Sequence, residues 1–127
     1  MIVLDASAVL AVLGSERGSD EVVERSIGGL ISTVNLAEIL QKTAHSGIEP
    51  QAVRDLISYA EWGVVHFDDD MAVAAAELWA QTRHNGLSLG DRACLALTQA
   101  VSGVALTMDR GWSGLEIAGA DIHVIER

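Results

Sequence analysis

The chain has 127 residues, half of them hydrophobic, which allows one domain with a sizeable core and excludes an intrinsically disordered protein. Its single cysteine, Cys94, excludes an intrachain disulfide framework and favours the reducing cytoplasm. The 18 acidic residues outnumber the 8 basic ones and give a formal net charge of −10, which argues against nucleic-acid binding through a basic surface.

Short aliphatic runs and longer stretches with helical spacing alternate along the chain. In chain order, the first half predicts a strand at residues 2–4, helices around 8–12 and 22–27, a strand at 30–32 and helices around 36–40 and 50–60. The second half predicts a strand at 64–67, helices at 71–83 and 91–101, and strands at 104–106 and 122–125. Because the strands are apolar on consecutive positions, the pattern predicts one α/β domain over residues 1–127 with a central, mainly parallel sheet of four or five strands.

We expect neither a membrane span nor a signal peptide. The apolar runs are shorter than the roughly 18 to 20 residues that cross a bilayer. Met1 leads straight into an apolar segment, with no basic region before it.

Four acidic residues stand at positions unlike those of the acids on solvated helix faces. Asp5 follows the first strand and Asp109 follows the fourth, while Glu38 and Asp91 lie near the starts of two helices. The carboxyl ends of the strands in an open α/β sheet form one edge, where ligands bind. We therefore expect Asp5, Glu38 and Asp109 to meet at that edge, a position with which Asp91 is also compatible.

Each of these acids also has a purely structural explanation. Asp5 could cap the helix that follows it, Asp109 could be a turn residue, and both Asn35-x-x-Glu38 and Ser88-x-x-Asp91 resemble capping boxes. Four carboxylates at one edge would nevertheless raise one another's pKa and destabilise the fold unless a cation binds among them. Without a neighbouring His or Cys motif, such a set favours Mg²⁺ or Mn²⁺, which suit phosphodiester hydrolysis.

At these residues the chain resembles the PIN-domain proteins, specifically the VapC-like toxins of bacterial toxin–antitoxin modules. The resemblance runs in order over essentially the whole chain. Its four motifs are Val3-Leu4-Asp5-Ala6-Ser7, Ser32-Thr33-Val34-Asn35-Leu36-Ala37-Glu38, Leu87-Ser88-Leu89-Gly90-Asp91 and Leu106-Thr107-Met108-Asp109.

The resemblance implies a three-layer α/β/α PIN-like fold and an endoribonuclease that depends on Mg²⁺ or Mn²⁺. It also implies a homodimer and a cognate antitoxin whose basic segment enters the acidic groove. The residues carried over by position are Asp5, Glu38, Asp91 and Asp109 as metal-binding and catalytic acids, with the hydroxyls of Ser7 and Thr107 in support.

Basic and aromatic side chains near the motifs suggest further contacts. Lys42, Arg92 and Arg110 each lie within four positions of a candidate acid, where they could contact substrate phosphates or form only surface ion pairs. Trp79 is expected in the core or in a dimer interface. Trp112 follows the fourth motif, where base stacking is an alternative to a structural role.

Two other functions remain open beside a toxin that cuts RNA. A receiver-type phospho-acceptor domain is also α/β with an acidic Mg²⁺ pocket, and the run Asp68-Asp69-Asp70 would then supply the acceptor. Against it, the first strand ends in a single Asp, and Lys42 is the only lysine. A catalytically silent PIN-fold binding module is the second alternative, although the complete set of four acids argues against it.

Overall fold

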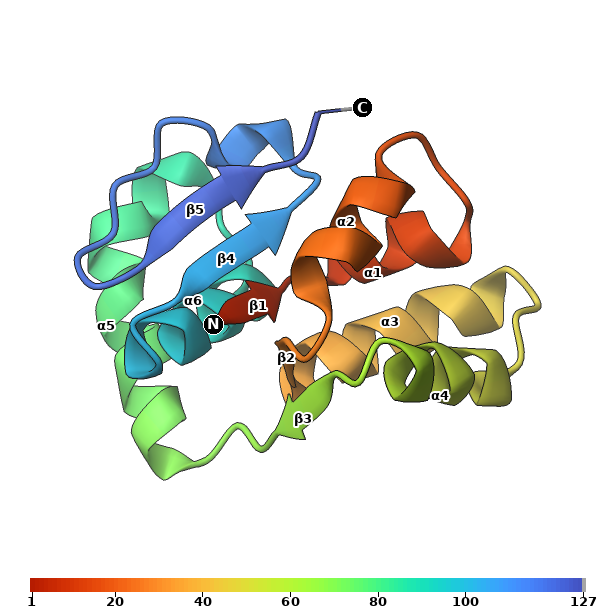
Figure 1. Cartoon of the computed structure of the whole chain (residues 1–127). Coiled ribbons are helices and arrows are strands. Elements are labelled where there is room, and N and C mark those ends of the chain that lie inside the picture. The colour runs from red at the N-terminus through yellow and green to blue at the C-terminus, as the bar shows by residue number, and fades with distance from the viewer. Residues whose placement is uncertain (127) are drawn as a thin grey trace.

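Five short strands form one fully parallel sheet in the computed structural model, which describes residues 1–126 (Figure 1). Their spatial order is β3-β2-β1-β4-β5, so the first strand is the central one. The strands are β1 (Ile2–Leu4), β2 (Leu30–Ser32), β3 (Gly63–Val65), β4 (Val104–Thr107) and β5 (Asp121–Val124). The predicted mainly parallel α/β fold is thus confirmed.

Helices connect the strands, and local sequence signals explain where most of them begin. Side chains of Asp5, Ser32, Asp68 and Ser88 accept amide hydrogen bonds at the first turns of α1, α3, α5 and α6, and α4 starts with a proline. No helix within residues 1–126 has the length and apolar character needed to cross a membrane. The α-helices are α1 (Ala6–Leu13), α2 (Ser19–Ser26), α3 (Thr33–His45), α4 (Pro50–Tyr59), α5 (Asp69–Thr82) and α6 (Leu89–Ala100), with short 3₁₀ helices η1 (Arg83–Asn85) and η2 (Arg110–Trp112).

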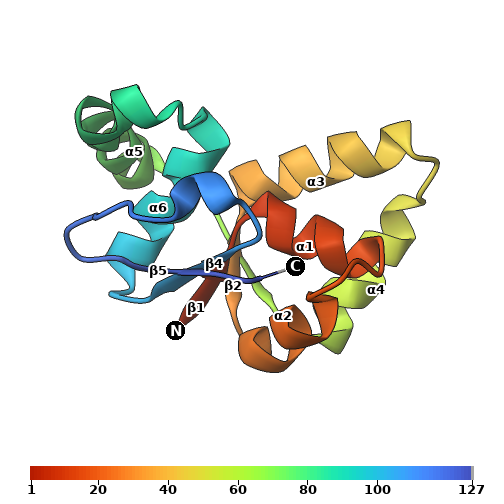
Figure 2. The same ribbon diagram turned by 90° about the horizontal axis from the view of Figure 1, so that it is seen from above.

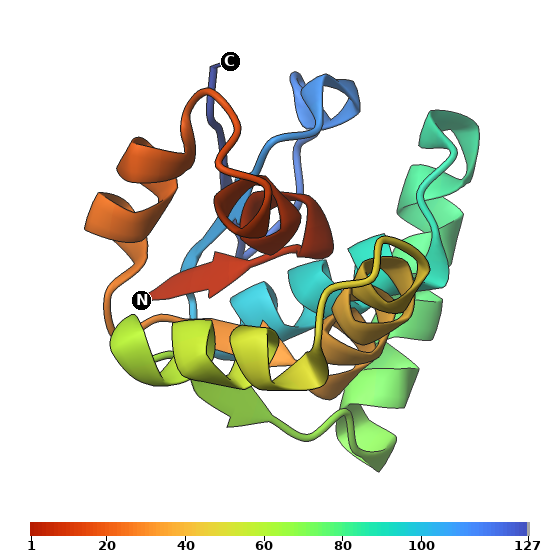
Figure 3. The same cartoon turned by 90° about the vertical axis from the view of Figure 1, so that its right-hand side faces the viewer.

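The helices cover both faces of the sheet and bury it in three layers. Figure 2 shows α5 and α6 on one side of the sheet and α2 on the other, and the side view in Figure 3 agrees. Successive residues of β1 face opposite layers: Val3 packs with the α5 and α6 residues, and Leu4 packs with those of α1 to α4. Because each face of the sheet has its own apolar core, the strands are apolar on consecutive positions, as the sequence predicted.

Three details differ from the sequence prediction. The third strand ends two residues earlier than expected, because the Phe67 amide donates to Thr33 Oγ1 (3.0 Å) and not to a neighbouring strand. Asn35 and Glu38 do not form a capping box, since α3 already begins at Thr33 behind Ser32. Trp79 is 51% exposed on α5, so of the two positions expected for it the core is wrong and the dimer interface stays a prediction.

Candidate metal centre

The carboxylate of Asp5 lies buried at the carboxyl end of the central strand. Asp5 is 3% exposed and caps α1, where its Oδ1 accepts the amide of Ala8 at 2.9 Å. Ser7 Oγ donates to Oδ1 at 2.8 Å, and Thr107 Oγ1 donates to Oδ2 across the β1–β4 pair. The predicted cap is therefore present, but its acid also accepts two hydroxyl hydrogen bonds that a cap does not need.

Ser7 and Thr107 also fix the segment that leads to Asp109. Ser7 Oγ accepts the amide of Met108 at 2.9 Å, and Thr107 Oγ1 accepts the amide of Asp109 at 3.0 Å. Each hydroxyl thus uses its single proton on Asp5 and its lone pairs on the backbone after β4. This arrangement holds the ends of β1 and β4 together around the Asp5 carboxylate.

Burial makes Asp5 harder to ionise than an ordinary aspartate. Loss of solvent raises the pKa of Asp5 from 3.8 to about 6, although the hydrogen bonds from Thr107, Ala8 and Ser7 act in the opposite direction. The negative charge of Asp91 raises this pKa further. A positive charge at this place would therefore stabilise the ionised form.

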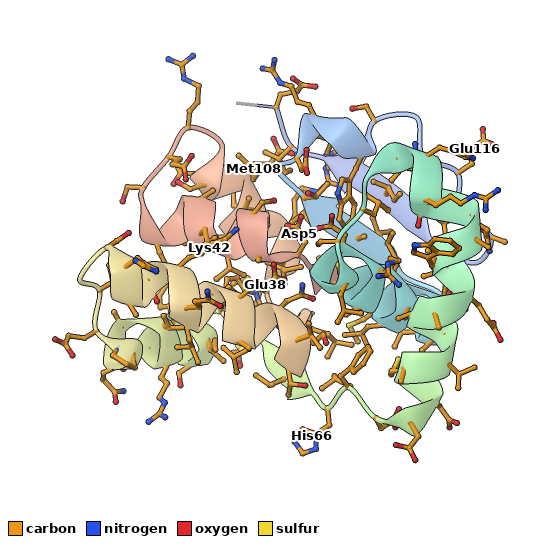
Figure 4. All side chains as sticks on the ribbon, turned by 180° about the vertical axis from the view of Figure 1, so that it is seen from behind. Asp5, Glu38, Lys42, His66, Met108 and Glu116 are labelled. Atoms are coloured by element: carbon orange, nitrogen blue, oxygen red, sulfur yellow. The ribbon has the colours of Figure 1, made fainter. Side chains whose placement is uncertain are left out.

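Glu38 and Asp91 come from two helices that pack on each other. Glu38 is half-buried on α3, and its Oε1 accepts the side-chain amide of Asn35 at 2.9 Å. Figure 4 shows Glu38 and Asp5 near the centre of the view, with Lys42 further along α3. Asp91 is half-buried in the first turn of α6 and forms the predicted capping box with Ser88, in which its Oδ2 accepts the Ser88 amide at 3.0 Å.

The charges of three of these acids act on the buried thiol of Cys94. Burial raises the pKa of the Cys94 thiol well above its usual value, and the charges of Asp5, Asp91 and Glu38 raise it further. The thiol therefore stays protonated and does not compete as a soft metal ligand. We call Asp5, Glu38 and Asp91 the acid cluster.

Asp109 stands apart from the acid cluster. Its side chain is exposed and accepts the amide of Gly111 at 2.8 Å, which caps η2 in the manner of a turn residue. Its backbone is linked to the cluster through Thr107. The role of Asp109 in metal binding stays a prediction, as do the metal-binding roles of the other three acids.

The chemistry of the donors in the cluster suits a hard divalent cation, although their side chains are not arranged as a closed site within residues 1–126. Within residues 1–126, no lysine, arginine or histidine forms an ion pair with any of the four candidate acids. In the same part of the chain, no three Asp, Glu, His or Cys side chains converge tightly enough to enclose an ion. Such a donor set suits Mg²⁺ or Mn²⁺, because these cations bind through few carboxylates and keep several waters.

The basic and aromatic residues near the motifs differ in what they contact. Lys42 and Arg110 are exposed, whereas Arg92 donates from its guanidinium to the Ala75 carbonyl of α5 at 3.2 Å. That contact favours a structural role for Arg92. Trp112 is 1% exposed in the core under α5 and α6, so the base-stacking alternative is wrong.

The family model of the PIN domain matches residues 2–117. No curated protein sequence matches the chain. Solved structures match the fold over nearly the whole length, at sequence identities that support likeness of fold alone.

Three of those solved structures are toxin–antitoxin assemblies. A chain of a toxin–antitoxin complex from Klebsiella pneumoniae has a TM-score of 0.71 and 17% identity, over 94% of this chain and 95% of that chain. A chain of VapBC2 from Rickettsia felis, bound to a DNA fragment from its promoter, has a TM-score of 0.71 and 16% identity, over 99% and 100%. A chain of DNA-bound VapBC from Salmonella typhimurium has a TM-score of 0.69 and 16% identity, over 97% and 96%.

The raised pKa of Asp5 predicts that the contribution of this residue to the stability of the metal-free protein falls as the pH rises from about 4 to 7. Over that range the folded state binds a proton that the unfolded state has released, and the loss amounts to about 3 kcal/mol. Asp5→Asn keeps a capping oxygen but carries no charge. In chelator, urea unfolding should therefore find that the stability of the variant relative to the parent rises from pH 4.5 to pH 8, on top of a pH-independent loss where the Asn amide nitrogen replaces an oxygen that accepts a hydroxyl hydrogen bond.

Asp68→Asn is the matched control, because Asp68 caps α5 through the Met71 amide but is exposed. It should show no pH-dependent gain over the parent. If Asp5→Asn instead lost the same stability at pH 8 and pH 4.5, Asp5 would be an ordinary helix cap.

Proposed function

Because the chain belongs to the PIN domain family, we propose that it is a VapC-like toxin, an endoribonuclease that depends on Mg²⁺ or Mn²⁺. The observation that carries the proposal is the acid cluster around Cys94, in which no basic side chain of residues 1–126 offsets the charge. A purely structural site would not concentrate carboxylates in this way, since like charges destabilise the fold. The likeness in fold to chains of VapBC assemblies supports the toxin assignment.

Asp5, Glu38 and Asp91 would hold the cation, with Asp109 completing the set from the end of β4. A bound Mg²⁺ or Mn²⁺ supplies a water of lowered pKa and offsets charge on the phosphate. Ser7 and Thr107 keep Asp5 in one orientation with its carboxylate accepting, which favours the ionised form at neutral pH. The exposed side chains of Lys42 and Arg110 are the candidates for contact with RNA phosphates.

The net charge of −10 makes RNA binding depend on the cation. The same charge suits a cognate antitoxin with a basic segment. A receiver-type domain is disfavoured by the family match and by the sheet order: Asp68 follows the edge strand β3, which β2 separates from β1 and Asp5. A catalytically silent PIN-fold module remains the alternative that an activity assay tests.

We expect the purified chain to cut RNA when Mg²⁺ or Mn²⁺ is added and to lose this activity when a chelator is added. Asp5→Ala and Asp91→Asn should each lower the cleavage rate by about 100-fold or more, because each removes a charge from the acid cluster. Asp91→Asn keeps an acceptor for the Ser88 amide, so it separates charge from helix capping. Asp68→Asn should cut at the parent's rate; equal cleavage by folded Asp5→Ala would contradict the site.

In cells, induction of this chain alone should arrest growth, because free toxin cleaves RNA that the cell needs. Asp91→Asn should relieve the arrest at equal protein level. Mapping the cleaved transcripts in the arrested cells would identify the substrate. Arrest by the parent and by Asp91→Asn alike would contradict a nuclease toxin.

We also propose a homodimer, supported by the exposed apolar side chains of Val73 and Trp79 on α5. Arg83 lies over the Trp79 ring, 5.8 Å from its centroid, and Trp79 is still 51% exposed. Light scattering should give twice the mass of one chain for the parent, and a lower mass for Trp79→Ser. A monomeric parent would rule the dimer out.

A further inference from the structure

Gly90 lacks a side chain at the place where the Glu38 carboxylate lies. It is the second residue of α6 and is buried. A Cβ atom at Gly90 would lie 2.1 Å from Glu38 Oε1 and 2.6 Å from Glu38 Cδ, far inside van der Waals contact. The carboxylate therefore rests on the bare Cα of Gly90, in space that any other residue would fill.

Asn35 ties the same carboxylate to the same residue of α6. Its Nδ2 donates to Glu38 Oε1 at 2.9 Å and to the Gly90 carbonyl at 3.0 Å, so one side-chain amide joins α3 and α6. Turning the amide over would place its oxygen against two acceptors, so the hydrogen-bond network fixes its orientation. Its Oδ1 is buried and has no hydrogen-bond partner within residues 1–126.

Neither feature is explained by stability. Glycine is less favourable than alanine inside a helix, and a buried carbonyl oxygen without a partner is unfavourable. Both features are accounted for if their role is to place Glu38. We infer that Gly90 and Asn35 are positioning residues, which together form a seat that holds the Glu38 carboxylate in the acid cluster beside Asp91. This inference rests on the proposed metal-dependent function.

The seat can be filled without unfolding the protein. The atoms that a Cβ at Gly90 would meet belong to the far end of a flexible side chain that is half-buried, so the carboxylate can move aside. Gly90→Ala should therefore unfold in chelator at a temperature no lower than the parent's. It should also bind Mn²⁺ about 10–100-fold more weakly by isothermal titration calorimetry, because the ligand is displaced.

Two further variants separate the seat from general effects. Asn35→Leu keeps the approximate size of the side chain and removes both donated hydrogen bonds, so it should weaken Mn²⁺ binding in the same direction. Gly14→Ala is the control, since Gly14 has φ −89° and an added Cβ would make only ordinary contact, 3.4 Å from Leu10 O. Its Mn²⁺ affinity should match the parent's.

The decisive test is a double-mutant cycle on Mn²⁺ affinity. If Gly90 acts through Glu38, Gly90→Ala should change the Kd less than about 2-fold in a Glu38→Ala background. An unchanged Kd for Gly90→Ala, or the same loss with and without Glu38, would overturn the seat and leave the proposed function standing. Failure of the parent itself to bind Mn²⁺ or Mg²⁺ would overturn the proposed function, and with it the metal role of the seat.

Discussion

The burial of the Asp5 carboxylate at the end of the central strand is the constraint on which the rest of the site depends. β1 lies between β2 and β4 and is covered on both faces, so the residue that follows it is only 3% exposed. Ser7, Ala8 and Thr107 donate to the carboxylate, yet its pKa still rises to about 6. Hydrogen bonds alone do not replace the lost solvent, and the negative charge of Asp91 adds to the deficit. A bound cation would stabilise the ionised carboxylate and so offset both the lost solvent and the charge of Asp91.

The net charge of the chain has to be interpreted together with the positions of its acidic residues. A net charge of −10 argues against a basic surface for nucleic acid. Three of the acids, Asp5 after the end of β1, Glu38 on α3 and Asp91 on α6, instead lie close enough to the buried Cys94 for their charges to act on its thiol. Under the proposed function a bound metal offsets the charge of those three, whereas the other acids are exposed to solvent and favour a basic partner.

Much of this could be predicted from the sequence, because the signals are local. Consecutive apolar positions such as Val3 and Leu4 indicated strands buried on both faces, and strand ends located Asp5. The seat could not be predicted, since it joins Glu38 to Gly90 across 52 positions of sequence and no local pattern marks it. The sequence left Trp79 between the core and a dimer interface because an alanine-rich helix does not reveal which face it buries. The sequence motif also does not decide whether Asp109 binds metal, because an aspartate at this position can equally cap η2, as it does here.

The most direct test of the central claim is the position of a bound ion. A crystal grown with Mn²⁺, measured with X-rays near the manganese absorption edge, would locate the ion by its anomalous scattering. We predict a peak in contact with the Asp5 carboxylate and with Glu38 or Asp91. An ion there would offset the negative charge that burial leaves uncompensated. A peak confined to exposed acids such as Asp68 to Asp70, with none at Asp5, would contradict it.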